Sequence, residues 1–352
     1  MLQHGGRLNT AVKRWGIPRE QWLDLSTGIN PTGWLVAELP MDAWQRLPEE
    51  DDGLEQVIRN WSGAPRAAGC VPVAGSQAAI MALPILRKPC RVGIPVPGYR
   101  EHGHSWQKAG HQVVPVAQAQ ANGGASGFDD RWLDQLDVLV WINPNNPTGH
   151  TIPPATLLRW HQRLQKRGGW LVVDEAFMDT TPGFSLCSRT GLPGLVVLRS
   201  LGKFFGLAGV RAGFVLADQT VAGSLREQLG PWAVSGPARY VMQQALLDTH
   251  WQAITRRRLS RDSQRLANLL GAAGLRVTGG TPLFQTIYAS KPWHLADTLA
   301  AEGILLRVFE QSARLRFGLP PENQWDRLQQ ALLSCTNSKY PSFGVDQTIT
   351  HC

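Results

Sequence analysis

Short apolar runs alternate with amphipathic stretches up to about residue 240 of the chain. Four nearly continuous apolar runs are typical of buried strands, and they occupy residues 90–99, 137–144, 169–177 and 195–203. Residues 153–168 have an amphipathic pattern that ends at Gly168, which predicts a helix. Strands separated by helices predict βαβ units, and therefore a mainly parallel sheet flanked by helices.

A different pattern follows this region. A helical run over 240–274 precedes strand-like segments at residues 284–290, 304–309 and 313–319, which predicts a smaller α+β lobe. The predicted fold class is therefore α/β with two lobes. The predicted parts are an N-terminal segment 1–35 that packs on the small lobe, a large domain 36–240, a small C-terminal domain 241–335 and a flexible tail 336–352.

Polar side chains gather where the predicted strands end. Tyr99, the segment 143–149, Asp174 and the segment 200–203 each lie at the end of an apolar run. In open parallel sheets, ligands bind outside the carboxyl ends of the strands. These residues are therefore the first candidates for a ligand site.

Composition limits the class of protein. Of the 352 residues, 43% are hydrophobic and 18% are charged, which suits a globular protein with a large core. No apolar run approaches the ~18 to 20 residues of a membrane span, and the N-terminal residues lack the apolar run of a secretory signal. The five cysteines form no CxxC pair, so we expect neither a metal site nor a disulfide framework. We expect a cytoplasmic protein with no membrane partner.

The chain is basic, with a formal net charge of +8. Such a charge is common in proteins that bind nucleic acid. The basic residues are spread along the chain, however, and the dense run Arg256–Arg258 falls in a predicted helix with no nucleic-acid-binding motif beside it. We interpret this run as a solvated helix face and expect no nucleic-acid partner. The positive charge suits an anionic substrate or cofactor.

The residues at the strand ends match the needs of pyridoxal 5'-phosphate (PLP). This cofactor requires a lysine for a Schiff base with its aldehyde, a carboxylate beside its ring nitrogen and a donor to its ring oxygen. Lys203, Asp174 and Asn146 offer these groups. Tyr99, or His102 in its place, offers an aromatic face on which the ring can stack.

The cofactor phosphate requires backbone, hydroxyl and guanidinium donors. Gly75, Ser76 and Gln77 lie at a turn that opens a predicted helix, which is a favourable position for a phosphate. Ser200 and Arg211, on either side of the candidate lysine, could complete this set. Each motif alone is weak, but their joint occurrence in this order predicts a PLP site.

The chain resembles the fold-type I, aspartate-aminotransferase-like PLP enzymes over about residues 1–335. The motifs that carry the resemblance are NNPTG, DEAF, SLGK and RAGF. The opening HGGRLNT, the segment LDLSTGINPTG and the lysine segment VLRSLGKFFGLAGVRAGF are similar to those of the threonine-phosphate decarboxylases of cobalamin synthesis. This resemblance implies PLP-dependent decarboxylation of L-threonine O-3-phosphate to (R)-1-amino-2-propanol O-2-phosphate and carbon dioxide.

The resemblance also implies how the substrate is bound, and it repeats the cofactor roles given above. Arg316, in RLRFG, matches the arginine that binds the substrate carboxylate. His4 and Gly5, in HGG, and Arg307, in ILLRVF, match positions that receive the substrate phosphate. Asn146 is implied to contact substrate as well as cofactor. A homodimer is implied too, because sites of this fold type are usually completed at a dimer interface.

Three positions depart from the pattern of related enzymes. Phe177 stands where many aminotransferases have a tyrosine, although the decarboxylases often have phenylalanine there. Gly28 stands where some relatives have an asparagine that contacts the substrate. Leu47 stands where many relatives have a tyrosine that reaches the cofactor phosphate of the partner subunit.

Other functions remain open at this point, because a fold does not by itself determine a reaction. A histidinol-phosphate or related aminotransferase would align the Cα–H bond instead of the Cα–carboxyl bond, a difference of one bond rotation. A non-catalytic PLP-binding regulator would usually carry an added DNA-binding domain, whereas the enzyme fold is expected to occupy this chain. A nucleic-acid binder would show salt-sensitive binding to DNA.

Overall fold

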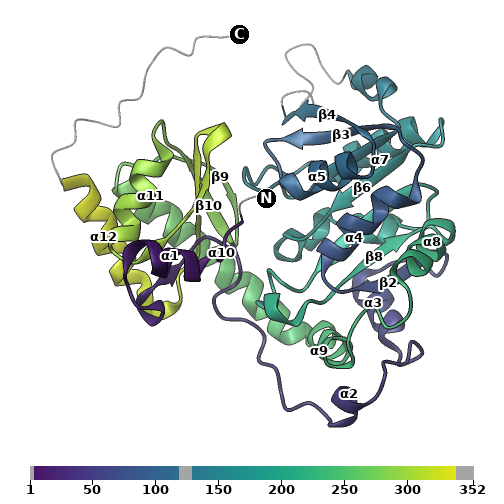
Figure 1. Cartoon of the computed structure of the whole chain (residues 1–352), viewed down its shortest axis with the longest axis horizontal. Helices are drawn as coiled ribbons and strands as arrows, with labels where there is room; N and C mark the ends of the chain where they lie inside the picture. The colour runs from purple at the N-terminus through teal and green to yellow at the C-terminus, as the bar shows by residue number, and fades with distance from the viewer. Residues whose placement is uncertain (1–3, 119–128, 338–352) are drawn as a thin grey trace. The chain divides into compact units, whose positions relative to one another are not determined.

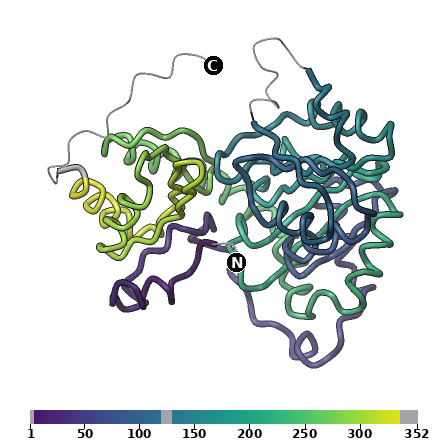
Figure 2. The backbone as a smooth tube through the Cα atoms, turned by 45° about the horizontal axis from the view of Figure 1, so that its top comes forward, coloured from purple at the N-terminus to yellow at the C-terminus, as the bar shows by residue number. Residues whose placement is uncertain are grey.

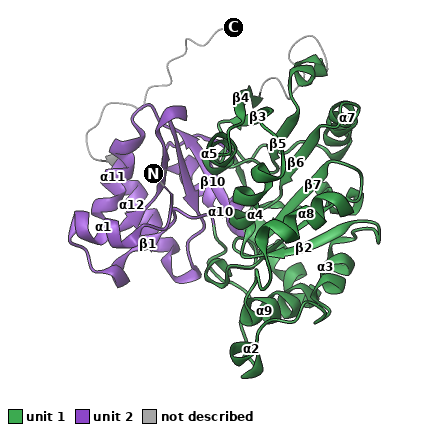
Figure 3. Cartoon of the chain, turned by 45° about the vertical axis from the view of Figure 1, so that its right-hand side comes forward, with its two compact units in different colours: residues 1–2, 29–261, 280–283 green, residues 3–28, 262–279, 284–352 purple. Residues whose placement is uncertain are grey.

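The computed structural model describes residues 4–118 and 129–337, and the chain divides into two compact units (Figure 1, Figure 3). Unit 1 comprises residues 1–2, 29–261 and 280–283, and unit 2 comprises residues 3–28, 262–279 and 284–352. The predicted fold class is confirmed, because unit 1 contains a mainly parallel sheet flanked by helices.

The sheet of unit 1 has seven strands among the described residues, in the order β2-β8-β7-β6-β5-β3-β4. Their bounds are β2 Gly69–Val73, β3 Arg91–Val96, β4 Gln112–Ala117, β5 Val138–Ile142, β6 Trp170–Asp174, β7 Leu195–Ser200 and β8 Gly213–Ala217. β8 runs antiparallel to β2 and β7, whereas the pairs from β7 to β4 are parallel. Each predicted apolar run contains one parallel strand, because such strands are covered on both faces.

Helices cover both faces of this sheet (Figure 1). They are α3 Leu54–Ser62, α4 Ser76–Ala82, α5 Arg100–Lys108, α7 Pro154–Gln165 and α8 Gln219–Leu229. Two further helices, α9 Gly236–Leu247 and the short α2 Asp42–Gln45, pack on each other, and α9 also packs on α3. Val140 of β5 shares a buried cluster with Ile80 of α4 and Leu225 of α8. Trp141, the next residue of β5, points to the opposite face and packs edge-on against Trp160 of α7, with ring centroids 5.3 Å apart.

Unit 2 is an α+β lobe. Most of its strands belong to a sheet of order β12-β13-β10-β9, with a separate short pair β1-β11. The strands are β1 Leu23–Asp24, β9 Val277–Thr281, β10 Phe284–Tyr288, β11 Ile304–Leu305, β12 Arg307–Phe309 and β13 Arg314–Gly318. The helices are α1 Leu8–Trp15, α11 Pro292–Ala301 and α12 Trp325–Asn337, together with the end of α10 Thr249–Ala272.

The N-terminal segment packs within unit 2. Ala11 and Trp22 share a buried cluster with Ala300 of α11, and Leu8 and Val12 of α1 pack against this cluster. β1 pairs in parallel with β11. Figure 2 shows this segment, in purple, beside the green to yellow C-terminal elements of the same unit.

The unit boundaries differ from the domain boundaries that the sequence suggests at residues 36 and 240. Residues 29–35 fall in unit 1, because Asn30 N and Trp34 N donate hydrogen bonds of 3.0 and 2.9 Å to the turn after β7. The second boundary falls after Arg261. It lies within α10, a helix that is continuous from Thr249 to Ala272, so this helix belongs to both units.

None of the helices in the described part of the chain is long and apolar enough to cross a membrane. The same residues hold no group of three or more His, Cys, Asp or Glu side chains that could bind a metal ion. Of the predicted tail, residues 336–337 form the end of α12, and residues 338–352 lie outside the described residues.

Candidate active site

A pocket of about 180 Å³ opens in unit 1 beside the carboxyl ends of β5 and β6. β5 ends at Ile142 and β6 at Asp174, and both residues line the pocket. The full lining consists of Ser76, Gln77, Tyr99, Ile142, Asn146, Asp174, Ala176, Phe177, Ser200, Gly202, Lys203, Ala208 and Arg211. The structure thus brings together the cofactor residues suggested by the sequence, except Gly75, which lies outside the lining.

Asp174 is buried at the end of β6, and its carboxylate has a partner on each oxygen. Oδ2 lies 2.8 Å from Nε2 of His102, a buried residue of α5. Oδ1 accepts a hydrogen bond from Ala176 N at 3.0 Å. These contacts hold the carboxylate in one orientation at the pocket wall. The sequence suggests His102 only as a substitute for Tyr99, because nothing local indicates a partner 72 positions away.

Lys203 lies in the turn that follows β7, and its side chain reaches the same pocket. Its Nζ lies 5.4 Å from the ring centroid of Phe177. Its main-chain carbonyl accepts hydrogen bonds from Asn30 N at 3.0 Å and from Gly206 N at 3.1 Å. The backbone of this residue is therefore held from two sides.

Asn146 belongs to the loop after β5, and neighbouring asparagines hold this loop in shape. Asn143 donates to Ile152 O at 3.1 Å and accepts from Ile152 N at 2.8 Å. Asn145 Nδ2 donates to Pro97 O at 2.9 Å. The loop is thus fixed on the N-terminal side of Asn146, whose side chain lines the pocket.

Gly75 leaves room for Arg211. Gly75 has a φ of 74°, and a Cβ added there would lie 2.7 Å from Arg211 Nη2. Arg211 also has a left-handed backbone, with a φ of 56°, and its Nη1 donates to Ala208 O at 3.3 Å. Ser76, at the start of α4, and Ser200, at the end of β7, line the same pocket as this guanidinium. Together they offer the donors that a phosphate requires.

Tyr99 has its hydroxyl group engaged and its ring at the pocket wall. The hydroxyl donates to Gln77 Oε1 at 3.1 Å, and Gln77 Nε2 donates to Glu101 Oε2 at 3.3 Å. The ring meets His102 edge-on, with centroids 6.1 Å apart. Tyr99 is therefore fixed as an aromatic surface.

The donor set of this pocket fits PLP. It contains an amine on Lys203, a carboxylate on Asp174, an amide on Asn146 and aromatic rings on Tyr99 and Phe177. The arginine and serine groups described above suit the phosphate. The chemistry of the side chains present therefore agrees with the cofactor that the sequence predicts.

A second group of predicted residues lies in unit 2. Arg316 is buried on β13, directly opposite Arg307 of β12 in the antiparallel register. Its Nη2 donates to Ser26 O at 2.6 Å, and its guanidinium lies 5.1 Å from the ring centroid of Phe284. Burial and the charge of Arg307 lower the pKa of Arg316 to about 9, although Asp24 acts in the opposite direction. The negative charge of a bound anion would favour the charged guanidinium and so offset this shift.

The residues suggested for the substrate phosphate also lie in unit 2. His4, Gly5 and Arg307 line a cavity of about 220 Å³, and Arg316 is outside its lining. A Cβ added to Gly5 would lie 2.4 Å from Ser26 O, so a larger residue would displace the segment. The structure therefore brings His4, Gly5 and Arg307 together around one cavity.

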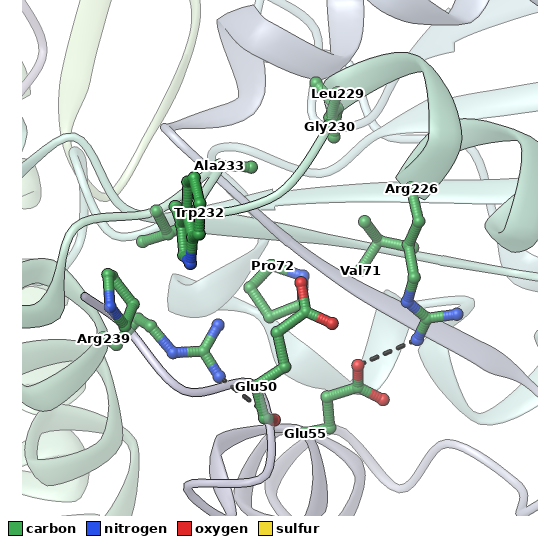
Figure 4. A pocket seen from close by; sticks show the side chains of 12 residues that line it. Glu50, Glu55, Val71, Pro72, Arg226, Leu229, Gly230, Trp232, Ala233 and Arg239 are labelled. Carbon is green, nitrogen blue, oxygen red and sulfur yellow. Dashed lines mark hydrogen bonds and ion pairs between the residues drawn. The ribbon is translucent and has the colours of Figure 1, made fainter.

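A smaller cavity elsewhere in unit 1 is shown in Figure 4. Its volume is about 30 Å³, which is room for water only. Arg226 at its edge donates to Glu55 Oε1 at 2.8 Å, and Arg239 donates to Asp52 Oδ1 at 2.7 Å. Its size and these internal ion pairs exclude it as a cofactor site.

A buried ion cluster lies next to the candidate site, and sequence reasoning missed it. Glu175 follows Asp174 in the chain, and Arg199 precedes Ser200. Arg199 Nη1 donates to Glu175 Oε2 at 2.9 Å, and its Nη2 donates to Asp179 Oδ1. All three ionic side chains are buried. The cluster ties the end of β6 to the end of β7, the two strands that lead into the site.

In the arginine run of α10, only Arg257 is exposed as the sequence suggested. Arg256 Nε donates to Asp179 O at 2.8 Å, and Arg258 Nη2 donates to Asn30 Oδ1 at 3.0 Å. The interpretation is wrong for these two residues, because their side chains bond to other segments of unit 1. A run of charges in the sequence does not reveal acceptors such as Asp179 O and Asn30 Oδ1, which lie far away along the chain.

Comparisons with known proteins identify the family. The family described as aminotransferase class I and II matches residues 52–332. A threonine-phosphate decarboxylase from Pseudomonas aeruginosa is 52% identical over 334 residues, which cover 95% of this chain and 98% of that protein. One from a Sinorhizobium species is 40% identical over 93% of this chain and 96% of that protein.

Among solved structures, the histidinol-phosphate aminotransferase from Sinorhizobium meliloti in complex with PLP has a TM-score of 0.79. It is 20% identical and covers 96% of each chain, so it shows the fold alone. The family resemblance suggested by the motifs is confirmed, and so is the prediction of PLP as cofactor, because the family is PLP-dependent. The chain therefore belongs to the aminotransferase class I and II family and, within it, to the threonine-phosphate decarboxylases.

Proposed function

We propose that this chain decarboxylates L-threonine O-3-phosphate, giving (R)-1-amino-2-propanol O-2-phosphate and carbon dioxide, with PLP as cofactor. The observation that carries this proposal is the 52% identity to a threonine-phosphate decarboxylase over nearly the full length of both proteins. We place the reaction in cobalamin biosynthesis in the cytoplasm.

In unit 1, we assign the cofactor to the pocket beside β5 and β6. Lys203 would hold the aldehyde carbon, Asp174 the ring nitrogen and Asn146 the ring oxygen. When bound, PLP supplies a carbonyl for a covalent link to an amine and a ring that accepts the electron pair of the bond broken at Cα. The remaining cofactor contacts are assigned to Gly75, Ser76, Gln77, Tyr99, Ser200 and Arg211.

Asp174 would hold a proton on the ring nitrogen. Its carboxylate is buried and has His102 Nε2 at 2.8 Å and Ala176 N at 3.0 Å as partners. A carboxylate held in this orientation can accept a hydrogen bond from a protonated ring nitrogen. The positioning of Asp174 by His102 therefore supports the electron-accepting role of the ring.

In unit 2, we assign Arg316 to the substrate carboxylate and His4, Gly5 and Arg307 to the substrate phosphate. Both substrate groups are anions, and the two arginines are cations whose mutual repulsion an anion would relieve. By fixing the carboxylate, Arg316 sets the rotation about the N–Cα bond. This rotation decides whether carbon dioxide or the Cα proton is lost, and Asn146 is assigned a further substrate contact.

We also propose that the chain acts as a homodimer. Unit 1 exposes large apolar side chains, which include Leu35, Met41, Trp44, Leu47 and Trp232, at 55% to 86% of their surface. Trp44 and Trp232 line an apolar groove of about 720 Å³. Exposed apolar patches of this kind mark protein–protein interfaces. Sedimentation of the wild type as a dimer and of W44E as a monomer would support this assembly, whereas a monomeric wild type would contradict it.

The reaction is tested by product analysis with L-threonine O-3-phosphate and no keto acid. Carbon dioxide and aminopropanol phosphate in equal amounts are expected, with no product from the Lys203→Ala variant. Amino transfer from histidinol phosphate to 2-oxoglutarate, without release of carbon dioxide, would instead establish an aminotransferase. Inactivity on both substrates would overturn the substrate assignment and leave the family membership unchanged.

A further inference from the structure

The turn Lys203–Gly206 is bonded to the distant segment 29–34. Asn30 N donates to Lys203 O at 3.0 Å, and Trp34 N donates to Phe205 O at 2.9 Å. The segments approach so closely that a Cβ on Gly206 would lie 2.5 Å from the Cα of Gly33. The turn that carries the candidate lysine is therefore held by a segment from another part of the chain.

The side chain of Asn30 adds to this contact. Nδ2 donates to Phe204 O at 2.8 Å across 174 positions of sequence. Oδ1 accepts from Thr32 N at 3.1 Å and from Arg258 Nη2 at 3.0 Å. Asn30 is 3% exposed, so its amide is buried with partners on both its nitrogen and its oxygen. A buried amide bonded in this way has one stable orientation.

Arg258 holds the segment from the other side. Its Nη2 also donates to Thr32 O at 3.0 Å. The guanidinium is mounted on α10, a helix of 24 residues, which gives it a rigid base. The contacts form a continuous path from α10 through Asn30 to the turn of Lys203. Neither Asn30 nor Arg258 lines the cofactor pocket, so both can act only through other residues.

We propose that Asn30 is a positioning residue for Lys203 and that Arg258 fixes Asn30. The amine of Lys203 must meet a particular carbon atom, and misplacement of a reacting group by ~1 Å can lower a rate about a hundredfold. The hydrogen bonds to Lys203 O and Phe204 O restrict such movement. This inference rests on the proposed function, which makes Lys203 the cofactor lysine.

The test uses the PLP-loaded full chain in the variants N30A, N30D, R258A and R258K. Four quantities are measured: the PLP dissociation constant, the pH midpoint of the absorbance of lysine-linked PLP, and kcat and KM for L-threonine O-3-phosphate. For N30A we expect a shifted pH midpoint, weaker PLP binding and a kcat lower by about tenfold with KM nearly unchanged.

The other variants separate the parts of the contact. N30D keeps an acceptor for Arg258, but a carboxylate oxygen replaces the nitrogen that donates to Phe204 O. Because two oxygens repel each other, the changes in PLP affinity and kcat should equal or exceed those of N30A. R258A should act in the same direction as N30A but more weakly, because Asn30 remains. R258K keeps one donor and should recover part of the loss. The double variant N30A/R258A should be little worse than N30A, because the two residues act through one contact.

Gln252 provides a matched control. It is 2% exposed, lies on the same helix as Arg258 and donates through its buried amide to Ala245 O and Leu246 O, both at 3.0 Å. Its oxygen accepts from Trp61 Nε1 at 2.8 Å and from Arg256 Nη2 at 3.4 Å, so none of these hydrogen bonds goes to the turn of Lys203. Q252A therefore measures the cost of losing a buried amide that makes no hydrogen bond to the turn of Lys203.

The proposal is supported if N30A shifts the pH midpoint and kcat while Q252A, at a similar loss of melting temperature, leaves both unchanged. It is overturned if N30A and Q252A lose stability alike and folded N30A keeps the wild-type pH midpoint, PLP affinity and kcat. If N30A does not fold, R258A and R258K decide by the same criteria. Formation of the covalent PLP link in K203A would instead overturn the role of Lys203, whatever the Asn30 variants show.

Discussion

Arg307 and Arg316 occupy directly opposed positions on the antiparallel strands β12 and β13. Like charges placed in this way destabilise a strand pair. Burial adds to the effect, since desolvation and Arg307 together lower the pKa of Arg316 to about 9. The arrangement costs stability in the ligand-free protein and favours the binding of an anion, as expected for residues that receive a phosphorylated amino acid.

The variant R307Q should separate stability from function. Loss of the opposing charge should stabilise the ligand-free protein by about 0.5 kcal/mol. KM for L-threonine O-3-phosphate should rise about tenfold, equivalent to about 1.4 kcal/mol. Thermal melts with and without inorganic phosphate provide the measurement, and phosphate should raise the melting temperature of the wild type more than that of R307Q. A ligand-free R307Q that melts below the wild type would contradict this account.

The pKa of Arg316 predicts a pH dependence. Burial and the charge of Arg307 hold the pKa of Arg316 in the folded chain at about 9, whereas the unfolded chain keeps this proton to a higher pH. The charged guanidinium therefore lowers the stability of the folded chain by its full amount below pH 9, and this cost declines as the pH rises above 9 toward the pKa of the unfolded chain. Substrate binding needs the charged form, so KM should rise above pH 9. In R307Q the rise should move to higher pH, and identical KM profiles would count against the role of Arg307.

The contact between His102 and Asp174 can be tested with a pair of variants. H102F keeps an aromatic ring but removes the 2.8 Å contact with the carboxylate. We expect its PLP dissociation constant to rise about tenfold. The loss of binding free energy is then close to that of one charge-assisted hydrogen bond. Y99F keeps its ring and loses the bond to Gln77, which does not involve the Asp174 carboxylate, so its change in PLP affinity should be smaller. Equal PLP affinities of H102F and wild type in an absorbance titration would refute the positioning role.

Gly75→Ala should damage the phosphate-binding part of the site. The new Cβ would lie 2.7 Å from Arg211 Nη2, on a residue with φ of 74°. The backbone strain alone should cost about 1 kcal/mol or more. Gly209→Ala is a matched control, because its Cβ would meet nothing within 4 Å. PLP affinity and melting temperature should fall for Gly75→Ala only; a similar fall in both variants would mean that any alanine in this region is harmful.

Arg199→Met tests the buried ion cluster. The substitution leaves Glu175 and Asp179 buried without the arginine from which both accept hydrogen bonds. Removal of one partner from a buried ion pair typically costs about 3–5 kcal/mol. Urea denaturation measures the loss, with Arg131→Met as the control, because Arg131 is 81% exposed in its pair with Asp129. Equal stabilities of the two variants would show that the cluster contributes nothing to the fold.

Much of the fold and cofactor chemistry follows from local sequence features. Parallel strands buried on both faces read as continuous apolar runs, so β3, β5, β6 and β7 can be recognised without a structure. Because their carboxyl ends lie at one edge of the sheet, the residues that follow them, including Asp174 and Lys203, can be assigned to one site. The types of side chain at these positions then point to PLP.

The contacts between distant segments follow only from the tertiary structure. His102 bonds to Asp174, Asn30 bonds to the turn of Lys203, and Arg307 lies opposite Arg316. The sequence places the second and third of these pairs in separate motifs and gives no sign of the first. A hydrogen bond or a strand register depends on distances of a few ångströms, which packing of the whole core determines. Amino-acid type and local periodicity therefore specify which groups are available, and tertiary packing decides which of them meet.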